Sequence, residues 1–248
     1  MTVFVHGVVP GTLGPVLPPR SESAMTVRLV RHDDVAALVT DVPERGSAAQ
    51  ALRAHGQLLD EVIAHTTVLP IRFGTTMEDD RSVRDAFLLP NIEGLSRLLE
   101  QLAGRVQVTV RCRYDQERLL RDAVERSAEI RCLRARVRQL PDAAGYFDRI
   151  RLGELVAAEI DRFRQRDVAL VTDTLADLAE AIRVDQPNTD DVAVNAAFLV
   201  LRSGVETFSR AAQRIADDVR QRMTVRCLGP LPPYSFADTN VMGALTWA

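Results

Sequence analysis

The sequence contains no lysine: all 31 of its basic residues are arginine, set against 34 acidic residues, and the net charge is −3. This balance gives no overall positive field that would draw the chain to nucleic acid or anionic lipid. Aromatic residues make up only 5% of the sequence, so few rings are available to stack on bases. No apolar run approaches the ~20 residues of a membrane helix. We therefore expect a soluble protein with no membrane and no nucleic-acid partner.

Cysteine is also scarce. The three cysteines, Cys112, Cys132 and Cys227, lie far apart and include no Cys-x-x-Cys pair. Zinc knuckles and redox motifs need such closely spaced pairs, and an odd number of separated thiols suits a reducing compartment. The N-terminus lacks a basic region followed by a long apolar run, so no signal peptide is indicated. We expect a cytoplasmic protein.

Motifs of catalysis are missing as well. The sequence has no Gly-x-Ser-x-Gly, no His-Glu-x-x-His and no glycine-rich loop with lysine, which excludes the commonest nucleophile, zinc and P-loop signatures. Capping, turns and solvation explain the paired aspartates, which stand at 33–34, 79–80, 190–191 and 217–218. We expect no enzyme, no catalytic, cofactor-binding or metal-binding residues, and no cofactor.

What the first half does contain is a series of short apolar strands and amphipathic helices. The patterns predict strands at 3–9, 27–30, 35–39, 68–73 and 106–112. They predict helices from a Ser47–Gln50 capping box onward, at 81–89, and at 92–102 with Asn91 as its cap. Two helices on a mainly antiparallel sheet suggest a modified ferredoxin-like α+β domain at 1–114, with a loop at 10–19 in place of the first helix.

The second half is richer in helix. Apolar residues recur at helical spacing from 116 to 183 around a breaker at 141–145, which predicts an antiparallel helical hairpin with a coiled-coil-like seam. A central strand at 192–201, a helix at 205–219 and a last strand at 223–228 follow. We thus predict a second, helix-rich α+β domain at 115–248.

A proline-rich segment follows the last strand. Pro232 and Pro233 stiffen the chain just before Tyr234 and Phe236. Two large apolar rings on a stiff tether are expected to fold back as a clip and pack on their own domain. The alternative is that the rings form an interface with another protein.

Four stretches together resemble a known family. They are VLPIRFGT at 68–75, GYFDRIRLGELV at 145–156, VNAAFLV at 194–200 and GPLPPYSF at 229–236. In this order they are similar to motifs of the gas vesicle protein GvpL/GvpF family, and the resemblance spans most of the chain. It implies a minor structural or accessory role in forming gas vesicles, the protein-walled flotation compartments of some microbes. The implied partners are the small shell protein and other gas vesicle proteins, and the implied location is the gas vesicle within the cytoplasm.

The resemblance also marks individual residues. We take Arg72, Phe73, Tyr234 and Phe236 as candidate interface or motif positions, and expect Arg72 to form a structural ion pair. Three further motif residues are expected in the core, namely Tyr146, Phe147 and Phe198.

Two alternative functions stay open. An enzyme or small-molecule-binding protein would use a pocket between the two domains, and scattered sites of that kind leave no motif. An RNA-binding module is disfavoured because the strand at 106–111 shows no ring, and because Glu125 and Glu129 accompany the arginines at 131–138.

Overall fold

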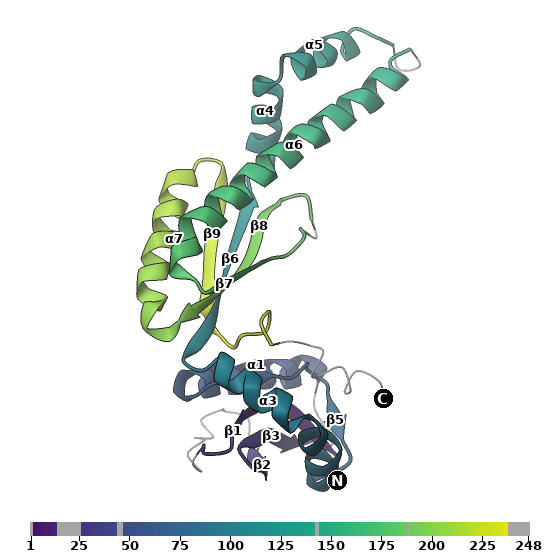
Figure 1. Cartoon of the computed structure of the whole chain (residues 1–248). Helices are drawn as coiled ribbons and strands as arrows, with labels where there is room; N and C mark the ends of the chain where they lie inside the picture. The colour runs from purple at the N-terminus through teal and green to yellow at the C-terminus, as the bar shows by residue number, and fades with distance from the viewer. Residues whose placement is uncertain (1, 14–25, 44–46, 142–143, 188, 238–248) are drawn as a thin grey trace. The chain divides into compact units, whose positions relative to one another are not determined.

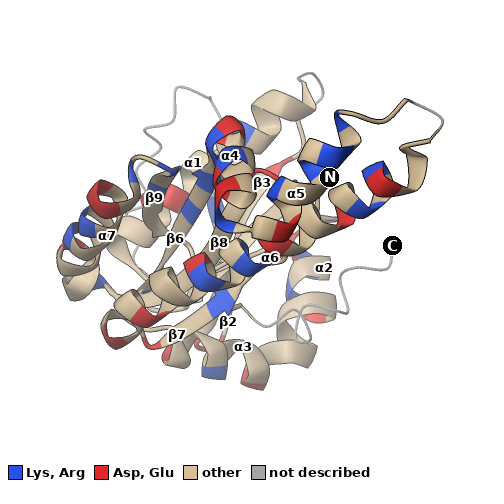
Figure 2. Ribbon diagram, turned by 90° about the horizontal axis from the view of Figure 1, so that it is seen from above, with Lys and Arg blue, Asp and Glu red and all other residues tan. Residues whose placement is uncertain are grey.

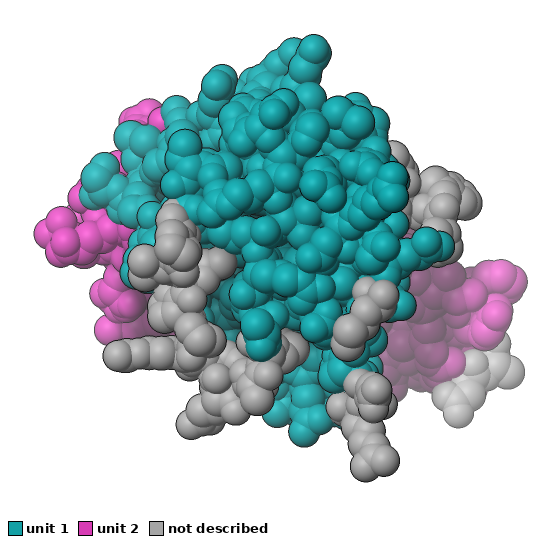
Figure 3. Space-filling view, turned by 90° about the horizontal axis from the view of Figure 1, so that it is seen from below, with its two compact units in different colours: residues 1–108, 199–203, 229–248 teal, residues 109–198, 204–228 magenta. Residues whose placement is uncertain are grey.

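The computed structural model describes residues 2–13, 26–43, 47–141, 144–187 and 189–237. The chain divides into two compact units, coloured separately in Figure 3. One comprises Met1–Val108, Leu199–Ser203 and Gly229–Ala248, and the other Thr109–Phe198 and Gly204–Leu228. Both combine helices with sheet, so the α+β class is confirmed. The predicted loop at 10–19 lies outside the described residues from residue 14 onward.

The first sheet lies entirely in the first unit. Its strands are β1 (Val3–Pro10), β2 (Arg28–His32), β3 (Val35–Asp41), β4 (Leu69–Pro70) and β5 (Thr76–Met77). They pair antiparallel in the order β2-β3-β1-β4, with β5 also on β1. The first three strands confirm the sequence prediction. The fourth is shorter than predicted because a turn follows it, in which Thr75 N–H donates to the Arg72 carbonyl at 3.3 Å.

Helices pack on this sheet. Helix α1 (Ala48–His65) opens with the predicted capping box, since Gln50 N–H donates to Ser47 Oγ and Ser47 N–H to Gln50 Oε1, both at 3.2 Å. The second helical region begins with α2 (Asp80–Ser82), continues through a π-helical segment η1 (Val83–Leu88), and ends as α3 (Leu89–Gln101).

The predicted cap at Asn91 is wrong. Asn91 lies inside α3, where its side-chain Nδ2 donates to the Phe87 carbonyl at 2.7 Å. The helical backbone runs on through this point from η1 into α3, so no helix starts there for Asn91 to cap. Gly104, at φ +69°, follows the end of the helix as predicted.

The second sheet has the strand order β7-β8-β6-β9. Its members are β6 (Arg105–Tyr114), β7 (Ala181–Val184), β8 (Val192–Leu201) and β9 (Met223–Leu231). The predicted central strand is confirmed, because β8 lies between two others. Helix α7 (Val205–Val219) places Phe208 against Phe198 of β8, with ring centroids 5.1 Å apart and both side chains fully buried. The expectation that Phe198 is a core residue is therefore confirmed.

Three helices precede β7 in the second unit (Figure 1). Helices α4 (Gln116–Arg126) and α5 (Ala128–Val137) both pack on the long helix α6 (Tyr146–Leu175). Ser127 separates α4 from α5 and caps the second, since Ile130 N–H donates to its Oγ at 3.3 Å. The prediction that helix continues to Ile182 is wrong: a 3-10 turn, η2 (Ala176–Leu178), ends it, and Ile182 belongs to β7. None of the helices in the described part of the chain is long and apolar enough to cross a membrane.

Candidate functional site

The motif at 68–75 places its two candidate residues in different surroundings. Phe73 is half-buried and stacks on Phe4, with ring centroids 6.3 Å apart and planes at 23°. Its ring also meets His55 edge-on, at 5.6 Å. Arg72 is exposed and forms no ion pair within the described ranges, so the expected structural ion pair is not found. Phe73 is thus held by packing, whereas Arg72 faces solvent.

A buried histidine pair lies beside Phe73. His6 of β1 and His55 of α1 are 3% and 4% exposed, and their Nδ1 atoms are 2.9 Å apart. The other ring nitrogen of His6, Nε2, is 2.9 Å from Thr40 Oγ1. In the contact between the rings one nitrogen donates and the other accepts, so the two imidazoles cannot both be charged, because a charged imidazole donates at both nitrogens. Burial, and then the neighbouring His55, lower the pKa of His6 to about 4, and burial lowers the pKa of His55.

This pair is not a metal site. Zinc needs about 2.0–2.1 Å to each nitrogen and usually four ligands, whereas the two Nδ1 atoms already contact each other. The described residues contain no group of three or more histidine, cysteine or acidic side chains placed to hold an ion. The cluster therefore ties α1 to β1. Sequence reasoning missed it because 49 positions separate the two histidines.

The histidine pair predicts acid sensitivity. The unfolded chain takes up a proton at His6 below its ordinary pKa of 6.5, whereas the folded chain does so only near pH 4. The stabilisation is thus fully present above pH 6.5 and is lost as the pH falls through this window. We expect a loss of about 3 kcal/mol by pH 4, at 1.36 kcal/mol per pKa unit. Urea denaturation at several pH values measures it. His6→Gln should flatten this part of the profile; an unchanged profile would contradict the assignment.

The C-terminal clip is anchored within the first unit. Ser235 N–H donates to Oε1 of Gln107, a nearly buried residue of β6, at 2.8 Å. Gly229 has φ +149°, and a Cβ there would lie 2.8 Å from the Gln107 carbonyl oxygen. Only glycine permits this close approach without strain. The clip therefore folds back onto the first unit rather than onto the second domain to which it was assigned, and Tyr234 remains 44% exposed while Phe236 is half-buried.

This partial burial sets the size of a second prediction. Tyr234→Ala with Phe236→Ala should lower the free energy of unfolding by about 3 kcal/mol, less than two fully buried rings would cost. Tyr234→Phe keeps the ring and should change stability by less than about 0.5 kcal/mol. Chemical denaturation measures both. An unchanged melting temperature together with lost assembly would instead place both rings at an interface with a partner.

The start of α6 carries the most exposed aromatic pair. Tyr146 is 60% exposed, Phe147 81% and Ile150 44%. The two rings touch each other edge-on, with centroids 5.4 Å apart. The expectation that Tyr146 and Phe147 are core residues is wrong. All buried residues of α6 lie from Glu159 onward, in the part of the helix where Asp167 also contacts Tyr114 of β6 and Arg222 before β9. We call Tyr146, Phe147 and Ile150 the tip patch.

Ion pairs, rather than these rings, link the start of α6 to α5. Arg136 Nε lies 3.0 Å from Asp148 Oδ2, and Arg151 Nη2 lies 3.3 Å from Glu129 Oε1. These ion pairs do not involve the tip patch, whose rings remain exposed. Figure 2 shows basic and acidic residues interspersed along the helices rather than gathered by sign.

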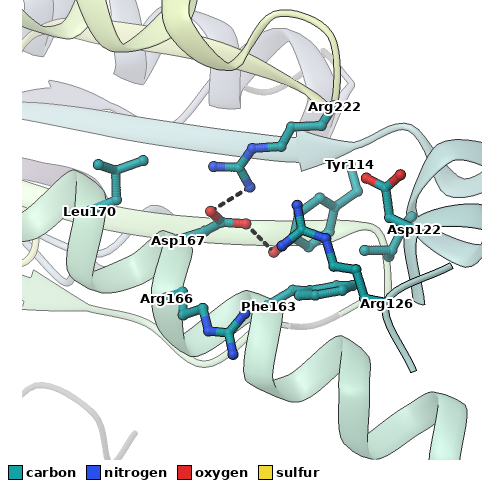
Figure 4. A pocket seen from close by; sticks show the side chains of 9 residues that line it. Tyr114, Asp122, Arg126, Phe163, Arg166, Asp167, Leu170 and Arg222 are labelled. Carbon is teal, nitrogen blue, oxygen red and sulfur yellow. Dashed lines mark hydrogen bonds and ion pairs between the residues drawn. The ribbon is translucent and has the colours of Figure 1, made fainter. Parts of the chain in front are cut away.

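A pocket opens between α4 and α6, inside the second unit (Figure 4). It has a volume of about 290 Å³ and is lined by Tyr114, Leu119, Asp122, Arg126, Phe163, Arg166, Asp167, Leu170 and Arg222. Asp167 is only 3% exposed. Its two oxygens are engaged, since Tyr114 Oη donates to Oδ2 at 2.6 Å and Arg222 Nη1 lies 2.5 Å from Oδ1. Burial and the bond to Asp167 raise the pKa of Tyr114, which keeps its hydroxyl a neutral donor.

This network could not be found from the sequence. Tyr114 ends β6, Asp167 lies on α6, and Arg222 precedes β9, so no local spacing connects them. The pocket also differs from the inter-domain pocket expected of an enzyme or small-molecule-binding protein. All its lining residues belong to the second unit. Within the described chain it presents one buried carboxylate, already paired, and no nucleophile next to a base.

The fold and these sites define a two-sheet α+β protein with an exposed aromatic patch on α6 and no recognised catalytic constellation among its described residues. Residues 2–238 match the family model described as "Gas vesicle synthesis protein GvpL/GvpF". The chain belongs to this family.

Individual relatives agree with the family assignment. The chain is 29% identical over 243 residues to gas vesicle protein F of Streptomyces sp. strain CB03234, covering 96% of this chain and 100% of that protein. It is 28% identical over 235 residues to gas vesicle protein L of the same strain, covering 85% and 82%. The crystal structure of GvpF from Anabaena sp. PCC7120 has a similar fold, with a TM-score of 0.83 at 22% identity over 96% of this chain and 98% of that one.

Proposed function

We propose that this protein is a non-enzymatic accessory or minor structural component of gas vesicle formation. It acts by associating with the shell protein and with other gas vesicle proteins. Family membership supports the process, and the tip patch supports the mode of action. The observation that carries the proposal is this patch. Two exposed rings and an exposed isoleucine lie within the five-residue stretch 146–150, which is part of a family motif.

The energetics of association favour this surface. Aromatic anchors dominate binding energy at protein interfaces, and Tyr and Phe bring large contact areas with few rotatable bonds. The Phe147 ring is 81% exposed, so it buries little apolar surface in the folded monomer and contributes little to its stability. Covering it with a partner removes apolar surface from water at roughly 25 cal/mol per Å². The patch therefore contributes little to the stability of the folded chain, whereas covering it with a partner would be favourable.

The other predicted surfaces contribute less. Arg72 is exposed and Tyr234 partly so, which makes these two candidate residues secondary contact positions in our proposal. Phe73 and Phe236 are assigned to support rather than contact.

The finer description of the fold is also a proposal. The strand order β2-β3-β1-β4 supports a modified ferredoxin-like N-terminal domain. The packing of α4 and α5 on α6 supports the helical hairpin. We place the domain limits at 1–114 and 115–248, and the protein at the gas vesicle within the cytoplasm.

Co-flotation tests the proposal. The vesicle gene set is expressed with this protein tagged, the vesicles are floated and washed, and the tag is blotted; the gene is deleted in parallel and vesicles are counted. Retention on washed vesicles, with vesicle loss on deletion, establishes a structural component. Vesicle loss without retention identifies an assembly factor that leaves the product. Normal vesicles after deletion, with no retention, would contradict the proposed function.

A further inference from the structure

The pocket between α4 and α6 is built from one face of each helix. Leu119, Asp122 and Arg126 line it from α4, at spacings of three and four residues. From α6, Phe163, Arg166 and Leu170 do the same. Residues three, four and seven positions apart share a helix face, so both groups point into one space. Figure 4 shows the buried Asp167 at its centre, bonded to Tyr114 and Arg222.

The acidic groups of the pocket are already engaged. Asp167 holds the Tyr114 hydroxyl and the Arg222 guanidinium, at 2.6 and 2.5 Å. Oδ1 of Asp122 lies 3.6 Å from Nε of Arg118, a residue of the same helix. Both oxygens of Asp167 are thus engaged, and one oxygen of Asp122 is engaged by Arg118.

Two arginines of the pocket have no acidic partner among the described residues. Arg126 lies over the ring of Phe163, with its Cζ atom 5.4 Å from the ring centroid. Such stacking uses the face of the guanidinium and leaves its N–H groups, which lie at the edge, free to donate. Arg166, from the facing helix, is exposed and forms no ion pair in the part of the chain that the structure describes. The lining thus carries three arginines against two aspartates.

We propose that this pocket binds an oxyanion, a carboxylate or a phosphate group, through Arg126 and Arg166. A guanidinium group presents several N–H donors, and both kinds of ion present several acceptor oxygens. The two therefore form charge-assisted hydrogen bonds. Phe163 and Leu170 supply apolar contact for the rest of the ligand. A volume of about 290 Å³ admits a small ion or a short acidic group. Arg222 stays with Asp167 and fixes the floor of the site.

Calorimetric titration tests this with two probes, inorganic phosphate and succinate, at constant ionic strength and pH 7. The purified full chain should bind at least one of them saturably. The double variant Arg126→Gln with Arg166→Gln should bind at least tenfold more weakly. Both side chains are exposed, so the melting temperature of this variant without ligand should match that of the wild type. Arg214→Gln, on the exposed side of α7, removes one positive charge away from the pocket and should leave binding unchanged.

Preference between the probes identifies the source of the anion. Tighter binding of phosphate indicates a phosphoryl-bearing ligand, and tighter binding of succinate indicates a carboxylate ligand; either supports the site. Equal affinity in the wild type and the double variant, or no binding of either probe to the wild type, would overturn it. The proposed anion site does not depend on the proposed gas vesicle role. Co-flotation measures association with vesicles, whereas titration measures binding of the anion to the purified protein.

Discussion

Replacing Asp167 by alanine is expected to lower the free energy of unfolding by about 3 kcal/mol. Removing one member of a buried ion pair typically costs 3–5 kcal/mol because its partner is left without a counter-charge. The cost here falls at the low end of that range, since the Arg222 side chain is 35% exposed and water can hydrate it. The buried Tyr114 hydroxyl loses its acceptor at the same time, which adds to the cost.

Denaturation in urea measures this effect, and two further variants sharpen it. Asp161→Ala removes an exposed carboxylate of the same helix, 2.6 Å from Arg164 Nη1, and should cost less than about 1 kcal/mol. Tyr114→Phe combined with Asp167→Ala should cost less than the sum of the single changes, because the two groups share a hydrogen bond. Equal losses for Asp161→Ala and Asp167→Ala would show that the network contributes nothing special.

Replacing both rings of the tip patch is expected to abolish vesicle formation while leaving the protein folded. Tyr146→Ala with Phe147→Ala removes side chains that are 60% and 81% exposed, so the melting temperature should change by no more than a few degrees. The loss of two aromatic anchors should cost at least 2 kcal/mol in association with a partner. Vesicles are counted after complementing a deletion strain with each variant.

The matched control for the tip patch lies elsewhere on the surface. Leu52 of α1 is 52% exposed and belongs to the first unit, so Leu52→Ala removes an exposed apolar side chain outside the patch. This variant should restore vesicles as well as the wild type does. Full complementation by the double tip variant would show that the patch is not used, whereas a lowered melting temperature would show that it packs within the folded chain.

The sequence predicts those parts of the fold that depend on neighbouring residues. The Ser47–Gln50 capping box lies within four consecutive residues, and nine of the ten residues of β8 are apolar, so both are visible locally. The expectation that Tyr146 and Phe147 are core residues failed for a physical reason. A motif marks which residues a family shares, but it does not say whether a partner covers them. On α6 the buried side chains begin only at Glu159.

The sites themselves were beyond local patterns. His6 and His55 are joined by a contact across 49 positions, and Tyr114 and Asp167 by one across 53. Each residue is unremarkable in its own segment, and its role arises from the tertiary fold. Within 68–75 the family motif did not separate the packed Phe73 from the exposed Arg72.

The central claim is that this protein works by direct contact with gas vesicle proteins through its tip patch. Site-specific photocrosslinking in vesicle-forming cells tests it most directly, with a photoreactive phenylalanine analogue in place of Phe147 and, as the control, in place of Leu52. The account predicts a crosslinked product at position 147 that contains the shell protein or another gas vesicle protein, and none at position 52. A protein that supports vesicle formation but gives no such product at position 147 would contradict it.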